Sequence, residues 1–443
     1  MGFWVRAGMV KRRVIGAYGL FNLPLAVVGL PLVIFIPPLY AVDLGVSLAA
    51  VGQVMMLARI ADVVIDPLIG VACDRFPTPF GRRRPWIFIG ALLTMLGVIK
   101  VFIPPGGAGA LYLLGWISVL YLGWSLATIP YLAWGSNLSS DYHERSVIAG
   151  TRELFTFVGV MMAFVAPAIL PHAPGSAATV ATLAHLILWV LPLATLVLFV
   201  VVPEPRVAAH SGHGFTEALK LLWRNLPFRR LMSASLLGGI GSAINASLLV
   251  LFYREMDLGG HTIALLGIYL FSAIAGVPFW VWLARRIGKH RALVAGSLWG
   301  CLWFAMVPFV PPGQFALLAT INLMTGLSIG AAPALGASMA ADVIDLDALR
   351  ARRDRSALFF SLWSMAAKFT GAIGIGIAYP VLGFLGWRAD GHGGPHAHFA
   401  LVAMYCLVPI GFWLAAVALL WNYPIDRVRQ ARIAGLVKRR FGR

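Results

Sequence analysis

The stretch ARIADVVIDPLIGVACDRF, residues 58–76, decides the fold of this chain. It is an apolar run whose first half contains three charged residues, Arg59, Asp62 and Asp66, before Asp74 and Arg75 at its end. Their spacing of i, i+3 and i+7 puts the three side chains on one face of a helix. A charge at the centre of a bilayer costs about 3 kcal/mol or more, so such a face needs a partner or a water-filled cavity. The rest of the chain decides whether this helix lies in a membrane.

The composition is that of a membrane protein. Of the 443 residues, 60% are hydrophobic and only 12% are charged, whereas soluble domains have about 25% charged residues. Apolar segments long enough to cross a bilayer core of about 30 Å recur along the chain. They lie at 14–39, 46–72, 85–104, 109–137, 147–170, 177–202, 231–253, 261–284, 292–310, 314–343, 357–386 and 398–423. We therefore expect an all-α integral membrane protein with 12 transmembrane helices.

The positive charges predict the orientation of these helices. Of the 35 Lys and Arg residues, 29 lie in the two termini and in every second loop, which would all be on one side of the membrane. Because such residues gather on the cytoplasmic side of a membrane, we expect both termini to lie in the cytoplasm. We expect the membrane to be the plasma (bacterial inner) membrane. The net charge of +18 is then a topology signal that faces anionic lipid, and it gives no reason to expect nucleic acid as a partner.

The longest polar interruption, residues 203–230, divides the chain into two sets of six segments. We expect an N-terminal six-helix bundle at 1–202, a cytoplasmic linker at 203–230, and a C-terminal six-helix bundle with a basic cytoplasmic tail at 231–443. Two six-helix pseudo-repeats are the layout of many secondary transporters. No phosphate-binding loop, HExxH or G-x-S-x-G motif is present in a suitable context, so we do not expect an enzyme or a cofactor.

The charged residues within the segments are the candidate functional residues. Two carboxylates one turn apart, Asp62 and Asp66, can coordinate a cation or share a proton; alternatively, they form a structural salt bridge with Arg59. Arg152 and Glu153 are adjacent in the fifth segment, and we expect them to have different partners because adjacent side chains diverge on a helix. Arg152, and Lys368 in the eleventh segment, either bind a solute or pair with a carboxylate.

Two motifs resemble a known family. ARIADVVIDPLIG is followed by FGRRRPWIFIG in the first half, and ADVIDLDALRARRDRSALFFSLWSMAAKFTGA lies in the second half. With these motifs the chain resembles the melibiose-permease-like glycoside–pentoside–hexuronide:cation symporter family of the major facilitator superfamily, over nearly its whole length. The resemblance implies a major facilitator fold, with cation-coupling roles for Arg59, Asp62, Asp66 and Ser125 and solute-pocket roles for Arg152 and Lys368.

The sequence departs from the family pattern at the cation site. The family has Asn or Thr just before the second aspartate, where this chain has Ile65. Na⁺ requires several oxygen ligands, whereas two aspartates can exchange protons without the missing one. We therefore expect H⁺ as the coupling ion and keep Na⁺, bound at Asp62 and Asp66, as the alternative.

The sequence departs from the family again at the solute pocket. The Lys–Asp pair of the galactoside-binding members is replaced by Leu25 and Ala26, and their helix-4 aspartate and tryptophan by Thr128 and Leu132. Because carboxylates that accept hydrogen bonds from two hydroxyls are a strong selectivity device, galactosides are not expected. A different pocket, or ordinary helix packing, is expected for Tyr18, Asn22, Thr128, Tyr131 and Trp134.

These observations predict a monomeric secondary active transporter that moves a small organic solute, a sugar or a glycoside, by alternating access. Two alternatives remain open. One is a carrier of the same fold that moves an amphipathic or lipid-like solute. The apolar replacements in the first and fourth segments, 14–39 and 109–137, favour it. The other is a membrane sensor or assembly factor that transports nothing.

Overall fold

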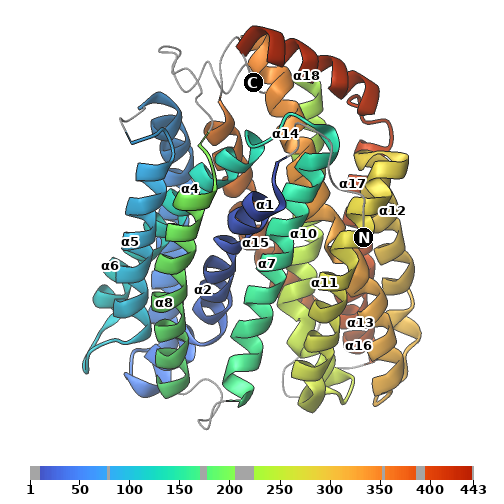
Figure 1. Ribbon diagram of the computed structural model, residues 1–443. Helices are drawn as coiled ribbons and strands as arrows, with labels where there is room; N and C mark the ends of the chain where they lie inside the picture. The colour runs from blue at the N-terminus through green and yellow to red at the C-terminus, as the bar shows by residue number, and fades with distance from the viewer. Residues whose placement is uncertain are drawn as a thin grey trace. The chain divides into compact units, whose positions relative to one another are not determined.

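The protein is a bundle of helices in a computed structural model, which describes residues 10–76, 80–169, 177–204, 224–351, 355–385 and 395–441 (Figure 1). The helices up to residue 204 are α1 (Arg12–Leu20), α2 (Asn22–Ile34), α3 (Ile36–Pro38), the π-helical turn η1 (Leu39–Asp43), α4 (Leu48–Arg75), α5 (Arg84–Phe102), α6 (Ala110–Ser136), α7 (Tyr142–Ile169) and α8 (Ala177–Val201).

The helices after residue 224 follow the same pattern of long elements with short breaks. They are α10 (Leu226–Glu255), η2 (Gly259–His261), α11 (Thr262–Ile287), α12 (Lys289–Phe304), η3 (Val307–Phe309), α13 (Phe315–Ile329), α14 (Ala331–Ala351), α15 (Ser356–Phe384), α16 (Pro395–Val402), the π-helical turn η4 (Ala403–Leu407), α17 (Val408–Trp421) and α18 (Arg427–Phe441).

Within the described residues, 10 helical stretches are long and apolar enough to cross a membrane. They correspond to ten of the twelve predicted segments. The other two segments, 14–39 and 46–72, are also helical, the first as α1, α2, α3 and η1 and the second as α4. The predicted class, an all-α membrane protein built from long apolar helices, is confirmed.

The chain forms two compact units, and each contains pieces that are distant in sequence. The first unit contains Met1–Ala218, Ile344–Met365 and Ala431–Arg443, and the second contains Leu219–Val343 and Ala366–Gln430. The helices α14 and α15 therefore contribute residues to both units. The division at a linker, 1–202, 203–230 and 231–443, stays a prediction, and residues 205–223 of that linker lie outside the described residues.

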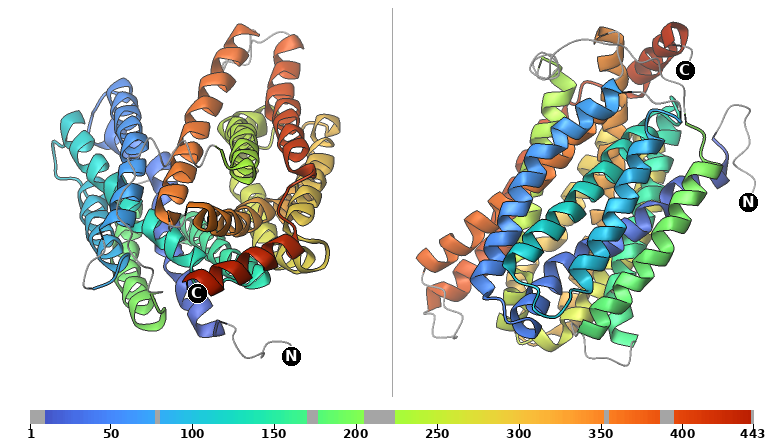
Figure 2. Two further views of the ribbon diagram at one scale, coloured as in Figure 1. Left: turned by 90° about the horizontal axis from the view of Figure 1, so that it is seen from above. Right: turned by 90° about the vertical axis from the view of Figure 1, so that its left-hand side faces the viewer.

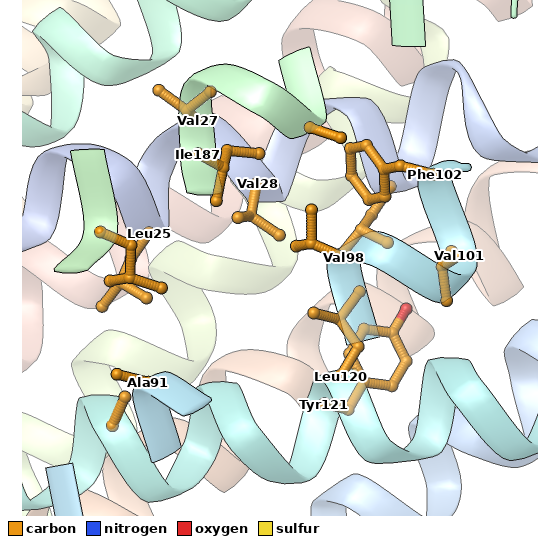
Figure 3. Packing of buried hydrophobic residues seen from close by; sticks show 14 of the residues in the cluster. Leu25, Val27, Val28, Ala91, Val98, Val101, Phe102, Leu120, Tyr121 and Ile187 are labelled. Atoms are coloured by element: carbon orange, nitrogen blue, oxygen red, sulfur yellow. The ribbon is translucent and has the colours of Figure 1, made fainter. Parts of the chain in front are cut away.

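In the first unit, α5, α6 and α8 run side by side (Figures 1 and 2). Their facing surfaces, together with α2, form a fully buried apolar cluster in which Val28, Val98, Leu120 and Ile187 are 0% exposed (Figure 3). Between helices in a membrane this packing stabilises through dispersion contacts, because lipid tails are as apolar as the side chains. The cluster fixes α6, the helix that packs against α4.

Close contact between α5 and α6 depends on glycine. A Cβ added at Gly123 of α6 would lie 2.5 Å from the backbone nitrogen of Thr94 on α5, and one added at Gly90 of α5 would meet the backbone of Ala127. Small residues at such positions let helix backbones approach each other. Two residues after Gly123 on α6, Ser125 contacts Asp62 of α4.

We expect Gly123→Leu to destabilise the protein by about 1–3 kcal/mol or more, because the added side chain forces the two backbones apart. The measurement is the thermal unfolding midpoint of the purified protein in detergent. Gly115→Leu on the same helix is the matched control, since nothing lies within 4 Å of a Cβ added there. Equal midpoints for the two variants would contradict this account of the α5–α6 contact.

Prolines shape the helices that carry the candidate site. Pro24 lacks an N–H group and cannot bond to the carbonyl of Leu20, and the first segment breaks there, with α1 ending at Leu20 and α2 beginning at Asn22. Pro67 lies inside α4 and in the same way leaves the carbonyl of Val63 without its helical partner. A backbone oxygen is therefore freed one turn from Asp66.

The second unit is held by aromatic and polar contacts. Phe252 of α10 stacks on Tyr405 of η4 with ring centroids 4.0 Å apart. Asn322 of α13 donates through Nδ2 to the Tyr253 hydroxyl at 2.7 Å. Asn245 of α10 donates to the carbonyl oxygen of Tyr405 at 3.2 Å. The π-helical turn thus has an amide donor from a neighbouring helix at one of its carbonyl groups.

Candidate functional site

Asp62 belongs to α4, its side chain contacts α6, and it is 4% exposed. The Ser125 hydroxyl donates to its Oδ1 at 3.0 Å, and Arg59 donates through Nη1 to its Oδ2 at 3.3 Å. Arg59 itself is 45% exposed along its side chain and lies over the Tyr121 ring, 4.9 Å from its centroid. The structure therefore brings together three of the four predicted cation-coupling residues: one buried carboxylate, one hydroxyl and one arginine.

Asp66, the fourth, is 0% exposed. It lies one turn after Asp62 on α4, so the Cβ atoms of the two aspartates are about 5–6 Å apart. The carbonyl of Val63, freed by Pro67, adds an oxygen to the same turn of the helix. Two carboxylates, a hydroxyl at Asp62 and a free carbonyl are groups that can hold a proton or a hard cation. Na⁺ or H⁺ are both compatible with this oxygen-rich set.

A second cluster joins α1, α6 and α7. The rings of Tyr18 and Tyr131 stack with centroids 4.4 Å apart. Each hydroxyl donates to the other residue's backbone carbonyl, Tyr131 to Tyr18 at 2.8 Å and Tyr18 to Tyr131 at 3.3 Å. Both tyrosines interact electrostatically with Arg152 of α7. The predicted pocket residues Tyr18, Tyr131 and Arg152 are thus neighbours.

Arg152 and Glu153 bond to each other, so the expectation of different partners was wrong. Nε of Arg152 donates to Oε1 of Glu153 at 3.0 Å, and Nη2 donates to the same oxygen. Adjacent helix positions do diverge, but both side chains are long enough to fold back. Isolated charges deep in a membrane helix are costly, and this cost favours the neutral pair.

Asn22 also reaches this cluster, through a residue that the sequence did not single out. Asn22 donates through Nδ2 to the Thr156 hydroxyl at 2.5 Å, and the Thr156 hydroxyl donates to the Arg152 carbonyl at 3.1 Å. Thr156 follows Arg152 by one helical turn, which is the signal that could have identified it. Thr128 lies one turn before Tyr131 on α6, and its hydroxyl is buried without a hydrogen-bond partner in the described part of the chain.

The other two predicted pocket residues are Trp134 and Lys368. The indole of Trp134 donates to the carbonyl of Pro203 at 2.9 Å and the ring lies beside Phe199 and the Arg84 guanidinium. Trp134 is therefore a packing residue at one end of the first unit. Lys368 lies on α15 within the second unit, and it is half-buried.

A network of charges at one end of the first unit was not predicted as functional. The Asp74 carboxylate accepts from the backbone N–H groups of Ala357 and Leu358, at 3.3 and 2.9 Å, at the N-terminus of α15. A helix N-terminus favours a negative group through its unpaired N–H groups and its dipole. Arg82 pairs with Asp74 at 3.1 Å, and Arg83 donates to the Ser356 hydroxyl at 2.7 Å.

The same end of the unit contains a buried ion pair. Nη2 of Arg145 on α7 lies 2.8 Å from Oδ2 of Asp345 on α14, with side chains that are 3% and 2% exposed. Arg355 pairs with Asp347 at 3.2 Å. The motifs GRRRPW and ADVIDLDALRARRDRS supply most of these residues. Their spacing in the sequence does not indicate which arginine pairs with which aspartate.

Comparison with known proteins identifies relatives over nearly the whole chain. The family model described as "MFS/sugar transport protein" matches residues 17–427. The isoprimeverose transporter of Lactiplantibacillus pentosus is 25% identical, covering 88% of this chain and 84% of its own length. The glucuronide carrier protein homolog of Escherichia coli is also 25% identical, covering 88% of both chains. Sodium-dependent lysophosphatidylcholine symporter 1 of Gallus gallus is 24% identical over 85% of this chain and 80% of its own.

Solved structures share the fold. The fucose:proton symporter of E. coli matches with a TM-score of 0.67 at 15% identity, covering 91% of this chain and 97% of its own. A bacterial homologue of the iron transporter ferroportin matches with a TM-score of 0.67 at 14% identity, over 94% and 99%. These two likenesses support the major facilitator fold.

Proposed function

Because the chain belongs to the MFS/sugar transport protein family, we propose that it is a cation-coupled secondary active transporter of a small sugar or glycoside, working by alternating access. The chain is a multi-pass membrane protein, and transport is proposed in place of any catalytic activity. The observation that carries the proposal is the pair of buried aspartates on α4, with Asp62 held by Ser125 and Arg59. Relatives named as transporters of isoprimeverose and carriers of glucuronides support the solute class.

The coupling ion is proposed to be H⁺, bound at Asp62 and Asp66. Protonation neutralises these carboxylates and lowers the cost of enclosing them away from water. Na⁺ is the alternative, favoured by the freed Val63 carbonyl as an extra oxygen and by the sodium-dependent symporter among the relatives. Ile65 offers no side-chain oxygen, which supports the proton.

The decisive experiment is uptake into proteoliposomes with the Na⁺ and pH gradients varied separately. The solute panel is isoprimeverose, a methyl glucuronide, a neutral methyl glucoside and lysophosphatidylcholine. We expect a glycoside to accumulate when the outside is more acidic than the inside, so that protons flow inward. Accumulation under a Na⁺ gradient alone would replace the ion but keep the function, and no accumulation of any panel member under either gradient would reject the proposal.

Ser125→Ala should change the ion dependence of uptake. The Ser125 hydroxyl donates to Asp62, so its loss removes one hydrogen bond from that carboxylate and one oxygen from the candidate cation site. A hydrogen bond of this kind in a membrane protein contributes about 1 kcal/mol, which corresponds to roughly a fivefold change in half-saturating ion concentration. The measurement is the ion dependence of uptake. Ser118→Ala is the control, because in the described residues Ser118 on the same helix bonds to its own helix, at the Leu114 carbonyl, 2.7 Å away. An unchanged ion dependence in Ser125→Ala would show that Ser125 has no role in binding the coupling ion.

A lipid-like solute is the second candidate. It is favoured by the lysophosphatidylcholine symporter among the relatives and by Leu25 and Ala26 at positions where galactoside carriers have charges. Lysophosphatidylcholine uptake without glycoside uptake in the panel above would select it. A protein that moves no solute and instead co-purifies with a membrane partner would fit the sensor or assembly factor.

We also propose the surroundings in which this transporter works. The 29 positively charged residues on one side favour cytoplasmic termini and contact with anionic lipid at the cytoplasmic face of a bacterial inner membrane. We propose a monomer, since one chain supplies both halves of the transporter layout.

A further inference from the structure

Glu153 is a buried carboxylate to which the proposed coupling mechanism gives no role. It and Arg152 have side chains that are 9% and 11% exposed. Both Nε and Nη2 of Arg152 donate to one oxygen, Oε1 of Glu153. This leaves Nη1 of the guanidinium and the second carboxylate oxygen outside the pair. The contact is therefore not the two-oxygen fork that makes arginine–carboxylate pairs strongest.

The pair lies inside the predicted membrane segment 147–170. Arg152, on α7, comes five residues after the start of that segment, about 7–8 Å along the helix. The groups facing it are Tyr18 of α1 and Tyr131 of α6, together with the amide of Asn22 on α2. The helix α8 carries His185, whose ring bonds to the exposed carbonyl of Ala181. In the described part of the chain, Glu153 is the one carboxylate that bonds to Arg152.

Neutral polar groups suited to hydroxyls lie on α2, α6 and α7, the helices that carry this pair and its neighbours. The hydroxyl of Thr156 and the amide of Asn22 bond to each other one turn from Arg152. The buried hydroxyl of Thr128, on the same face of α6 as Tyr131, has no partner in the described residues. A buried hydroxyl without a partner costs about 1–3 kcal/mol, and a ligand hydroxyl would satisfy it.

We propose that Glu153 is the internal counter-ion of a carboxylate-binding site at Arg152: it neutralises Arg152 when the carrier is empty, and it takes up a proton when the carboxylate of a sugar acid or glycoside acid replaces it. This inference deepens the proposed function and rests on it for the solute class. It adds a second proton-binding site to the transport cycle, separate from the one at Asp62 and Asp66.

The charge balance explains why a proton must enter with the solute. The empty site holds one cation and one anion. A bound solute carboxylate would give two anions against one cation, and a net charge at this depth is costly. One proton taken from water onto a Glu153 carboxylate oxygen restores neutrality, and it leaves with the solute on the other side. A neutral sugar would not displace Glu153, because hydroxyls compete poorly with a carboxylate for a guanidinium.

The test is equilibrium binding of two matched probes, methyl β-D-glucuronide and methyl β-D-glucoside, to purified protein in lipid nanodiscs. In Glu153→Gln the competing charge is gone. We expect the glucuronide to bind at least about tenfold more tightly than to the original protein, while the affinity for the neutral glucoside is unchanged. In the original protein glucuronide binding should strengthen as the pH falls, by up to about tenfold per unit, and this dependence should be lost in the variant.

Two further variants keep the result interpretable. Glu144→Gln makes the same chemical change on the same helix at a carboxylate that bonds to the Val10 N–H and the Ser139 hydroxyl, and it should behave as the original protein. Glu153→Asp retains the charge on a shorter arm and should give intermediate affinity, which serves if Glu153→Gln does not fold.

Equal changes for both probes in Glu153→Gln would overturn the proposal. So would the absence of glucuronide binding to the original protein and to the two Glu153 variants. The outcome is separable from that of the proposed function, because binding needs no ion gradient. A protein that accumulates only neutral glycosides would retain its proposed function and lose this site. Tight glucuronide binding without gradient-driven uptake would do the reverse.

Discussion

Asp66→Asn is expected to abolish gradient-driven accumulation of a neutral glycoside while leaving exchange of that solute intact. Asp66 is completely buried at the centre of α4, and Asn has nearly the same shape but neither releases a proton nor balances a cation. A pH difference of one unit is worth about 1.4 kcal/mol, which supports roughly tenfold accumulation by a carrier that moves one proton per solute. The variant should equilibrate the solute, with a ratio of about 1.

The measurement compares accumulation with counterflow in proteoliposomes, because counterflow requires the carrier to reorient with solute but needs no ion gradient. Asp43→Asn is the matched control, since Asp43 in η1 is an exposed carboxylate of the same unit. It should accumulate solute as the original protein does. If Asp66→Asn also concentrates solute fully, the coupling ion is held elsewhere.

The helices could be predicted because their signal is local. Each long apolar run is helical. The turn of α4 that carries Asp62 and Asp66 could be predicted because charged residues stand out in an apolar run, and helical spacing places them on one face. What the sequence did not indicate were the interruptions, such as the break at Phe21 and the π-helical turns η1 and η4. These depend on where the backbone groups freed by prolines, or displaced by packing, find partners on other helices.

Pairings between distant segments were beyond the reach of spacing arguments. Asp74 accepts from the N–H of Leu358, 284 positions away, and nothing in either segment specifies the other. Trp134 shares a helix face with Tyr131, yet its indole found the Pro203 carbonyl because α8 ends there and leaves that oxygen free. The Arg152–Glu153 pair shows that spacing can also mislead for neighbours in sequence. Their side chains diverge at the backbone but are long enough to bond to each other.

Arg145→Ala is expected to be among the most destabilising single changes away from α4. Its partner Asp345 is 2% exposed along its side chain and lies 2.8 Å from the Arg145 guanidinium. Removing one member of a buried ion pair leaves the other charge uncompensated, at a cost of about 3–5 kcal/mol. The measurement is the free energy of unfolding in mixed micelles. Glu255→Gln, which breaks the half-exposed Glu255–His398 pair, should cost less than about 1 kcal/mol.

A double-mutant cycle decides whether the cost comes from the stranded charge. If it does, Arg145→Ala combined with Asp345→Ala should cost less than Arg145→Ala alone, because no buried charge remains. Costs that simply add would mean that Arg145 stabilises the unit through contacts other than Asp345, such as the Ser139 carbonyl at 2.8 Å. We expect the single variant, more than the double, to lose transport along with stability.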